Sequence, residues 1–232
     1  MQSVAERGTL TAPRPAVRGT GKHGVMAFSS ILKKVAMALT GLGMFLFLIG
    51  HLAGNLLLLK GPDSFNGYAA FLAKIPLVVP VEIGLLLLAL LHIASAVSVT
   101  LGNWTARPQR YAVKRTAGSS TFASRTMWIG GLVLAVFIPL HVWMFKYGDH
   151  HGPQELYGLV MRSFQNPLIA FGYAFAMIPL GLHLSHGFAS AFQTLGINRP
   201  RLRPRLRAAG AVLGWLIALG FLVLPFWGFF GQ

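Results

Sequence analysis

The sequence predicts an all-α integral membrane protein, a bundle of five transmembrane helices. Of its 232 residues, 54% are hydrophobic and only 11% are charged, and the mean hydropathy is +0.61. A soluble domain of this composition would expose a largely apolar surface to water. The apolar residues also gather into five long runs, and the basic residues lie between these runs. Lipid is therefore the expected solvent for most of the chain.

The five runs are long enough to cross a bilayer. A hydrocarbon core of about 30 Å needs about 20 apolar helical residues. We expect spans at roughly 35–59, 80–102, 126–146, 167–195 and 209–229, which together form one transmembrane domain over residues 29–232.

Residues 1–28 differ from the rest of the chain. They place four basic residues among Pro, Gly and Thr, with no apolar stretch and no small-residue cleavage site. This composition predicts a flexible basic cytoplasmic tail rather than a signal peptide.

The distribution of Lys and Arg predicts the orientation. Basic residues accumulate on the cytoplasmic side of short loops, and an odd number of spans puts the two termini on opposite sides. The tail, the second loop and the fourth loop hold nearly all of them, whereas the other side has only Lys60, Lys74, Lys146 and Arg162. We expect the N-terminus in the cytoplasm and the C-terminus outside, across the inner (cytoplasmic) membrane of the cell.

The net charge of +15 could suggest nucleic-acid binding, but its confinement to loops beside apolar spans indicates a topological role. The arginine-rich loops either touch anionic lipid or dock an acidic cytoplasmic partner. No connection between the expected spans exceeds about 25 residues, so no soluble domain can carry a substrate site. The chain has no cysteine, which excludes thiolate and iron–sulfur ligation and leaves histidine to hold any metal.

Five of the eight histidines fall within the expected spans. His23, His150 and His151 lie in the tail or an outer loop, where a solvated side chain is the usual state. An ionisable residue at membrane depth is costly and needs a partner or a function. The histidines expected at membrane depth are His51, His92, His141, His183 and His186.

Four of these histidines pair by depth. With a rise of about 1.5 Å per residue, His51 lies about 25 Å beyond Lys34 and His141 about 8 Å before Lys146, so both are toward the outer side. On the same scale, His92 lies about 18 Å from the start of its span and His183 about 25 Å from the start of its own. The second pair therefore lies in the middle-to-inner part of the membrane.

Two histidine pairs from different helices, at two depths, suit bis-histidine ligation of two stacked haems. A single buried histidine is more often an interhelical hydrogen-bond donor, and the pairing by depth argues against that interpretation here. His186 follows His183 by three residues on a similar face, so spacing leaves open which of the two binds iron.

Several motifs resemble the cytochrome b subunit of succinate dehydrogenases, in the single-chain, five-helix, di-haem form shared with some fumarate reductases. The resemblance runs from about residue 29 to the C-terminus. It is carried by SSI with Lys33 and Lys34, MALTG at 37–41, HLAGNL at 51–56, FNGYA at 65–69, GLHLSHG at 181–187 and SAFQTLG at 190–196.

The resemblance implies a membrane-anchor subunit of succinate:quinone oxidoreductase that does not itself act on succinate. A flavoprotein and an iron–sulfur subunit would dock on its cytoplasmic face. Electrons would pass through two haems b to a quinone, either menaquinone or ubiquinone. By the family pattern, His92 with His183 holds the inner haem iron and His51 with His141 the outer one, which leaves His186 beside the site.

Two further residues bear on the chemistry. Some fumarate-reducing relatives carry a glutamate two positions before the fourth ligand as part of a proton path, and here that position is Gly181, which favours succinate oxidation. Glu82, the one acid at the mouth of a span, is a candidate for proton exchange with quinone. Its alternative is an interfacial carboxylate facing water.

Other functions remain to be weighed against this one. The alternatives within the family are a haem-free anchor of the same complex and a subunit of a quinol:fumarate reductase. A cytochrome b serving another dehydrogenase would share the histidines but not the motifs. A proton or metal transporter would call for more intramembrane carboxylates or for repeated halves with broken helices, and the sequence has neither.

Overall fold

The computed structural model describes residues 29–106, 121–148 and 152–231, and all the regular secondary structure in these ranges is helical. The predicted tail over 1–28 lies outside the described residues, as do His23, His150 and His151.

Five long helices form the body of the molecule. Each is long and apolar enough to cross a membrane, which confirms the five-span prediction. They are α1 (Ser30–Asn55), extended by the 3-10 turn η1 (Leu56–Lys60), α3 (Val78–Thr105), α4 (Phe122–Lys146), α6 (Pro167–Thr194) and α7 (Arg203–Phe230).

Polar caps begin three of these helices close to the predicted starts. The Ser29 side chain accepts a hydrogen bond from the backbone N–H of Leu32 at 3.2 Å. Thr121 and Ser124 form a reciprocal capping box at the start of α4. Asn166 caps α6 at 2.9 Å from Leu168 N, with Pro167 in the first turn. Such caps satisfy backbone donors that the helix itself leaves free.

Two short helices, α2 (Pro62–Ala73) and α5 (Leu156–Gln165), lie in connections that the sequence had suggested were loops. They meet at the end of the bundle where α1 and α4 stop, and there the Asn66 side chain accepts a hydrogen bond from Tyr157 N at 2.8 Å. The buried side of α5 presents Val160, Met161 and Phe164 to the bundle. These two helices cover that end of the bundle.

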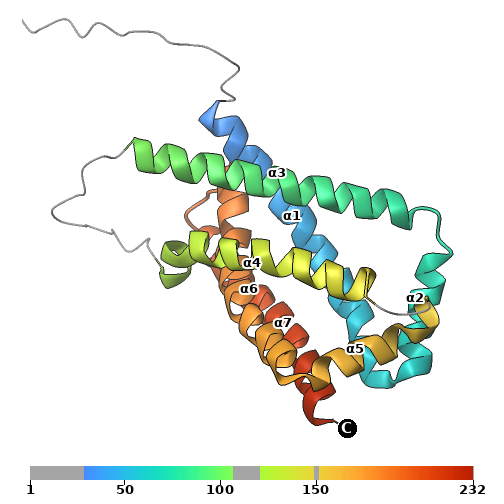
Figure 1. The fold of residues 1–232 in the computed structure, drawn as a ribbon. Helices are drawn as coiled ribbons and strands as arrows, with labels where there is room; N and C mark the ends of the chain where they lie inside the picture. The colour runs from blue at the N-terminus through green and yellow to red at the C-terminus, as the bar shows by residue number, and fades with distance from the viewer. Residues whose placement is uncertain (1–28, 107–120, 149–151, 232) are drawn as a thin grey trace, which may run out of the picture.

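The long helices pack unevenly (Figure 1). α6 and α7 lie together along their lengths, because Gly210 and Gly214 of α7 bring its backbone against Ser185 of α6. α3 packs on α1, α4 packs on α6, and α1 packs on α6. Among the described residues, α1 does not pack closely on α4, nor α3 on α6. Two helix pairs are thus held side by side without close backbone contact.

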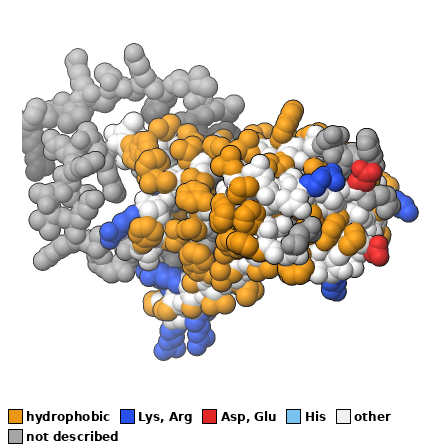
Figure 2. Space-filling model, turned by 60° about the horizontal axis from the view of Figure 1, so that its bottom comes forward, with side chains coloured by type: hydrophobic (Ala, Val, Ile, Leu, Met, Phe, Trp, Pro, Cys, Tyr) orange, Lys and Arg blue, Asp and Glu red, His pale blue; other side chains and the backbone are white. Residues whose placement is uncertain are grey.

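The exposed surface is apolar (Figure 2). Hydrophobic side chains cover the middle of the face shown, and Lys and Arg side chains lie toward its two ends. Large apolar residues such as Leu168, 83% exposed, face outward on the long helices. This distribution is the one expected where lipid is the solvent.

Candidate functional site

The intramembrane histidines meet as two pairs. The ring centroids of His51 on α1 and His141 on α4 are 5.8 Å apart, at an interplanar angle of 86°. Those of His92 on α3 and His183 on α6 are 6.2 Å apart, at 64°. Each pair bridges two helices that do not pack closely on one another in the described part of the chain. The space between these helices is therefore spanned by imidazoles.

These separations suit a metal ion between the two rings. Two imidazole–metal bonds of about 2 Å, with about 1.2 Å from each nitrogen to its ring centroid, give a centroid separation of roughly 6.4 Å. Both observed separations lie within 0.6 Å of that value. No hydrogen bond joins the two rings of either pair in the ranges described, so direct imidazole pairing does not account for the approach.

The hydrogen bonds of His92 indicate which of its nitrogens carries the proton. Its Nδ1 lies 3.1 Å from the carbonyl oxygen of Met37, which can only accept, so Nδ1 carries the proton. The Thr40 hydroxyl is 3.2 Å from the same nitrogen and donates to Ala36 O at 2.7 Å. The lone pair of His92 is therefore on Nε2, the nitrogen that this geometry leaves free to bind a metal.

His183 is held differently. Its Nδ1 is buried and has no hydrogen-bond partner among the described residues. Gly131 of α4 lies against the ring, since a Cβ there would be 3.7 Å from His183 Cε1. Gly41 of α1 lies in the same way against His92, where a Cβ would come within 3.1 Å of Cε1. Two glycines thus border the inner pair.

Aromatic rings surround the outer pair. Phe47 stacks on His51 with centroids 5.1 Å apart and an interplanar angle of 19°. The Asn55 amide nitrogen is 3.4 Å from His51 Nδ1. His141 lies beside Phe137 and Phe145, and its Nδ1 is 3.3 Å from the hydroxyl oxygen of Tyr173.

Each pair offers only two imidazole ligands, which suits a metal already held by a cofactor such as a macrocycle. Within the described ranges, no three or more His, Cys, Asp or Glu side chains gather as they would around zinc. An axial pair of imidazoles is what haem requires, because the macrocycle supplies the other four nitrogens. The two pairs therefore fit haem better than a bare metal ion.

The remaining predicted residues are not members of either ring pair. His186 is one turn beyond His183 on α6 and is close enough to Arg207 of α7 to interact with it electrostatically. Glu82, near the start of α3, forms an ion pair with Lys146 at the end of α4, with the two side chains 43% and 42% exposed. Glu82 thus has a charged partner that the sequence did not predict.

The small residues near the histidines have different roles. A Cβ at Gly50 would meet nothing within 4 Å, which agrees with open space beside His51. Gly54, one turn beyond His51, lies against Tyr68, which a Cβ would approach to 2.5 Å. At Gly181 a Cβ would come within 2.7 Å of the Trp215 ring. Gly54 and Gly181 therefore serve helix packing.

Sequence reasoning missed Gly41, Gly131 and Tyr173 as neighbours of the imidazoles. Gly41 stands in the MALTG motif, and Gly131 follows another glycine in the third span. Nothing in the sequence links any of the three to a particular histidine, because each contact joins different helices.

Comparison with known proteins gives one informative similarity. No protein-family profile matches the chain, and no solved structure matches it. Over 157 residues, 66% of this chain and 73% of the relative, the sequence is 24% identical to the succinate dehydrogenase cytochrome b558 subunit of Bacillus subtilis (strain 168). With the five spans and the motifs above, this similarity confirms that the chain resembles the cytochrome b membrane-anchor subunits of succinate dehydrogenase.

Proposed function

We propose that this chain is the di-haem membrane anchor of a succinate:quinone oxidoreductase and relays electrons between an iron–sulfur subunit and membrane quinone. The observation that carries the proposal is that the histidine rings meet in two pairs. The ring centroids are 5.8 Å apart in one pair and 6.2 Å apart in the other. The similarity to a relative from Bacillus subtilis that is named a cytochrome b558 subunit supports haem b as the cofactor.

In this proposal, His92 and His183 hold the inner haem b, and His51 and His141 hold the outer one. The haem irons supply one-electron redox chemistry when bound. The chain positions them: the Met37 carbonyl orients His92, and Gly41 and Gly131 leave space beside the inner rings. Because the helices that carry each pair do not pack closely among the described residues, a flat macrocycle can lie between them.

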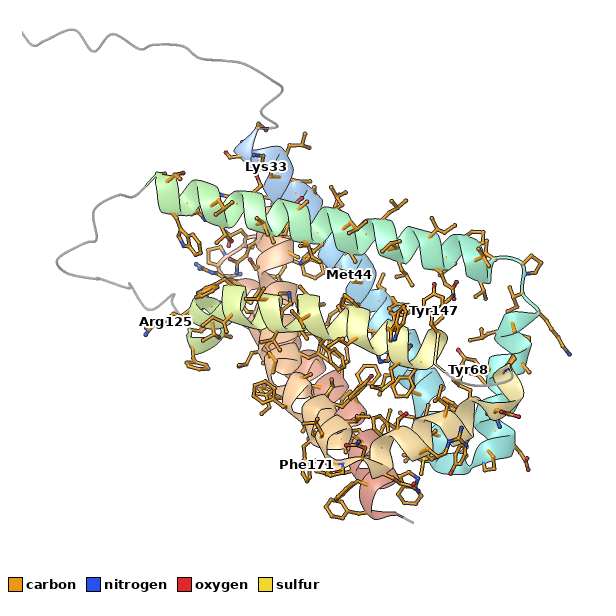
Figure 3. All side chains as sticks on the ribbon, viewed as in Figure 1. Lys33, Met44, Tyr68, Arg125, Tyr147 and Phe171 are labelled. Carbon is orange, nitrogen blue, oxygen red and sulfur yellow. The ribbon has the colours of Figure 1, made fainter. Side chains whose placement is uncertain are left out.

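The charges favour docking of soluble partners at the inner end. Lys33 and Arg125, labelled in Figure 3, lie at the end of the molecule where α1 and α4 begin. The first turns of α7 add Arg203, Arg205 and Arg207. The acids among the described residues, Asp63, Glu82 and Glu155, belong to the outer connections or to the outer end of α3. An acidic face on an iron–sulfur or flavoprotein subunit would complement this basic end, with the N-terminus in the cytoplasm.

We favour succinate oxidation over fumarate reduction. The Trp215 ring lies against Gly181, so a glutamate at that position would collide with an indole. A proton path through a carboxylate at residue 181 is therefore incompatible with this packing.

Glu82 remains our candidate for proton exchange with quinone. It lies at the outer end of α3 and is half-exposed, and Lys146 holds it beside α4. If it serves in this way, Glu82→Gln lowers quinone turnover and changes its pH dependence. Unchanged turnover and an unchanged pH profile would restrict Glu82 to its ion pair.

The decisive test is the haem content of the purified complex, measured as the pyridine haemochrome per copy of this chain. We expect two haems b, both reduced by succinate in a reduced-minus-oxidised spectrum. One haem would mean that one histidine pair does not bind iron. No haem would leave the haem-free anchor.

A further inference from the structure

Tyr173 places one hydroxyl inside a cluster of aromatic rings. Its ring lies on α6 within 4.9 Å of Phe137, 5.7 Å of Phe145 and 5.2 Å of Phe164, measured between centroids. Burying a hydroxyl among apolar rings is costly unless it is hydrogen-bonded. A phenylalanine would fill the same space without that cost, so the hydroxyl itself calls for an explanation.

The hydroxyl has two neighbours, both on α4. It lies 3.3 Å from Nδ1 of His141, and it donates to Sδ of Met144 at 3.7 Å. The sulfur can only accept, so it offers the phenol proton an acceptor when Nδ1 of His141 carries a proton of its own. The phenol oxygen keeps its lone pairs for a donor, and Nδ1–H of His141 is the donor within reach.

The direction of this bond determines which nitrogen of His141 can bind a metal. If Nδ1–H donates to Tyr173, the lone pair of His141 is on Nε2. The imidazole N–H then donates to the phenol oxygen, and the phenol O–H donates to the thioether sulfur. Among the described contacts of His141, the phenol oxygen is the one hydrogen-bond acceptor.

We propose that Tyr173 is a positioning residue that sets the tautomer of His141 and lowers the midpoint potential of the outer haem. This inference rests on the proposed function, since it takes His141 as an axial ligand. An acceptor at Nδ1–H makes the imidazole a stronger electron donor. A more basic ligand favours ferric over ferrous iron, so removing the acceptor raises the potential.

The test is Tyr173→Phe in the intact complex, followed by potentiometric titration of both haems. The outer haem is identified as the spectral component that is lost in His141→Ala. We expect a three- to tenfold change in its ratio of reduced to oxidised haem at a fixed potential, equivalent to about 30–60 mV for a one-electron couple. The inner haem and the total haem content should not change.

Tyr147→Phe is the matched control, because it removes the phenol of an exposed tyrosine at the end of α4, the helix that carries His141 (Figure 3). It should leave both potentials unchanged. An unshifted outer potential in Tyr173→Phe, with two haems still bound, overturns the proposal.

Loss of the outer haem in Tyr173→Phe is resolved by a second variant. Phe137→Leu trims the same ring cluster but removes no hydroxyl. If Phe137→Leu keeps the outer haem, the hydroxyl of Tyr173 is what positions His141. If both variants lose it, the cluster acts by packing alone and the proposal fails. A wild-type complex without an outer haem overturns the proposed function and this inference together, whereas two haems with no shift overturns only the inference.

Discussion

The inner and outer histidine pairs have similar separations but different surroundings. At the inner pair, the backbone carbonyl of Met37 and the Thr40 hydroxyl hold His92, and glycines face both rings. At the outer pair, aromatic rings surround both histidines, and a tyrosine hydroxyl contacts His141. A carbonyl partner belongs to the helix itself, whereas a phenol can be lost by a single substitution. The outer site is therefore the one whose properties side-chain changes can tune most easily.

The largest expected effect tests the division into two sites. His92→Ala or His183→Ala should remove the inner haem and keep the outer one, and His51→Ala or His141→Ala should do the reverse, because an axial ligand is lost in each case. Haem quantification and low-temperature spectra of each variant measure this. Full haem content in both variants of one pair would show that this pair does not ligate iron.

A smaller effect tests the role of glycine at the inner pair. A Cβ at Gly41 would come within 3.1 Å of His92 Cε1, so Gly41→Ala should displace the imidazole and weaken haem binding by roughly tenfold, the lower end for a residue that orients a ligand. Gly102→Ala near the end of α3 is the control, because Gly102 is exposed and nothing among the described residues lies within 4 Å of its Cβ. Equal haem retention in the two variants under increasing detergent would contradict this role.

A still smaller effect sharpens the contrast in hydrogen bonding. Thr40→Val removes a buried hydroxyl beside His92 but leaves the Met37 carbonyl in place. We expect the inner potential to change less than the outer potential changes in Tyr173→Phe, since His92 keeps an acceptor and His141 does not. Potentiometric titration of both variants decides this, and a larger shift at the inner haem would reverse the comparison.

The smallest effect concerns the ion pair between α3 and α4. Both side chains are more than a third exposed, and such pairs contribute about 0–1 kcal/mol to stability. The coupling between Glu82→Gln and Lys146→Gln in a double-mutant cycle should therefore be under about 1 kcal/mol, and smaller still at high salt. A coupling of several kcal/mol, measured by thermal unfolding, would mean that the pair is buried in the assembled complex.

The sequence predicted the spans well because apolar run length is a local property. It did not predict α2 and α5, since helices of 12 and 10 residues with polar positions resemble ordinary loops. Depth counted along each helix predicted which histidines face one another, and the ring pairs in the structure are the same ones. The sequence could not predict which residues of neighbouring helices contact each histidine. The contacts of Gly41 with His92 and of Tyr173 with His141 depend on how the helices are rotated about their axes.

The uneven packing of the long helices bears on how the protein is assembled. α1, α6 and α7 contact one another directly, whereas α3 packs chiefly on α1 and α4 chiefly on α6. Bound haem would then link α1 to α4 and α3 to α6. In this way the cofactors would stabilise the helix bundle as well as carry electrons. We expect the chain made in haem-starved cells to insert its helices but to be degraded faster than in haem-replete cells. Pulse-chase labelling measures the two half-lives. Equal half-lives would mean that the helices do not need haem to hold them together. Haem binding would then act as a quality-control step, because only the haem-loaded chain would persist long enough to assemble with its soluble partner subunits.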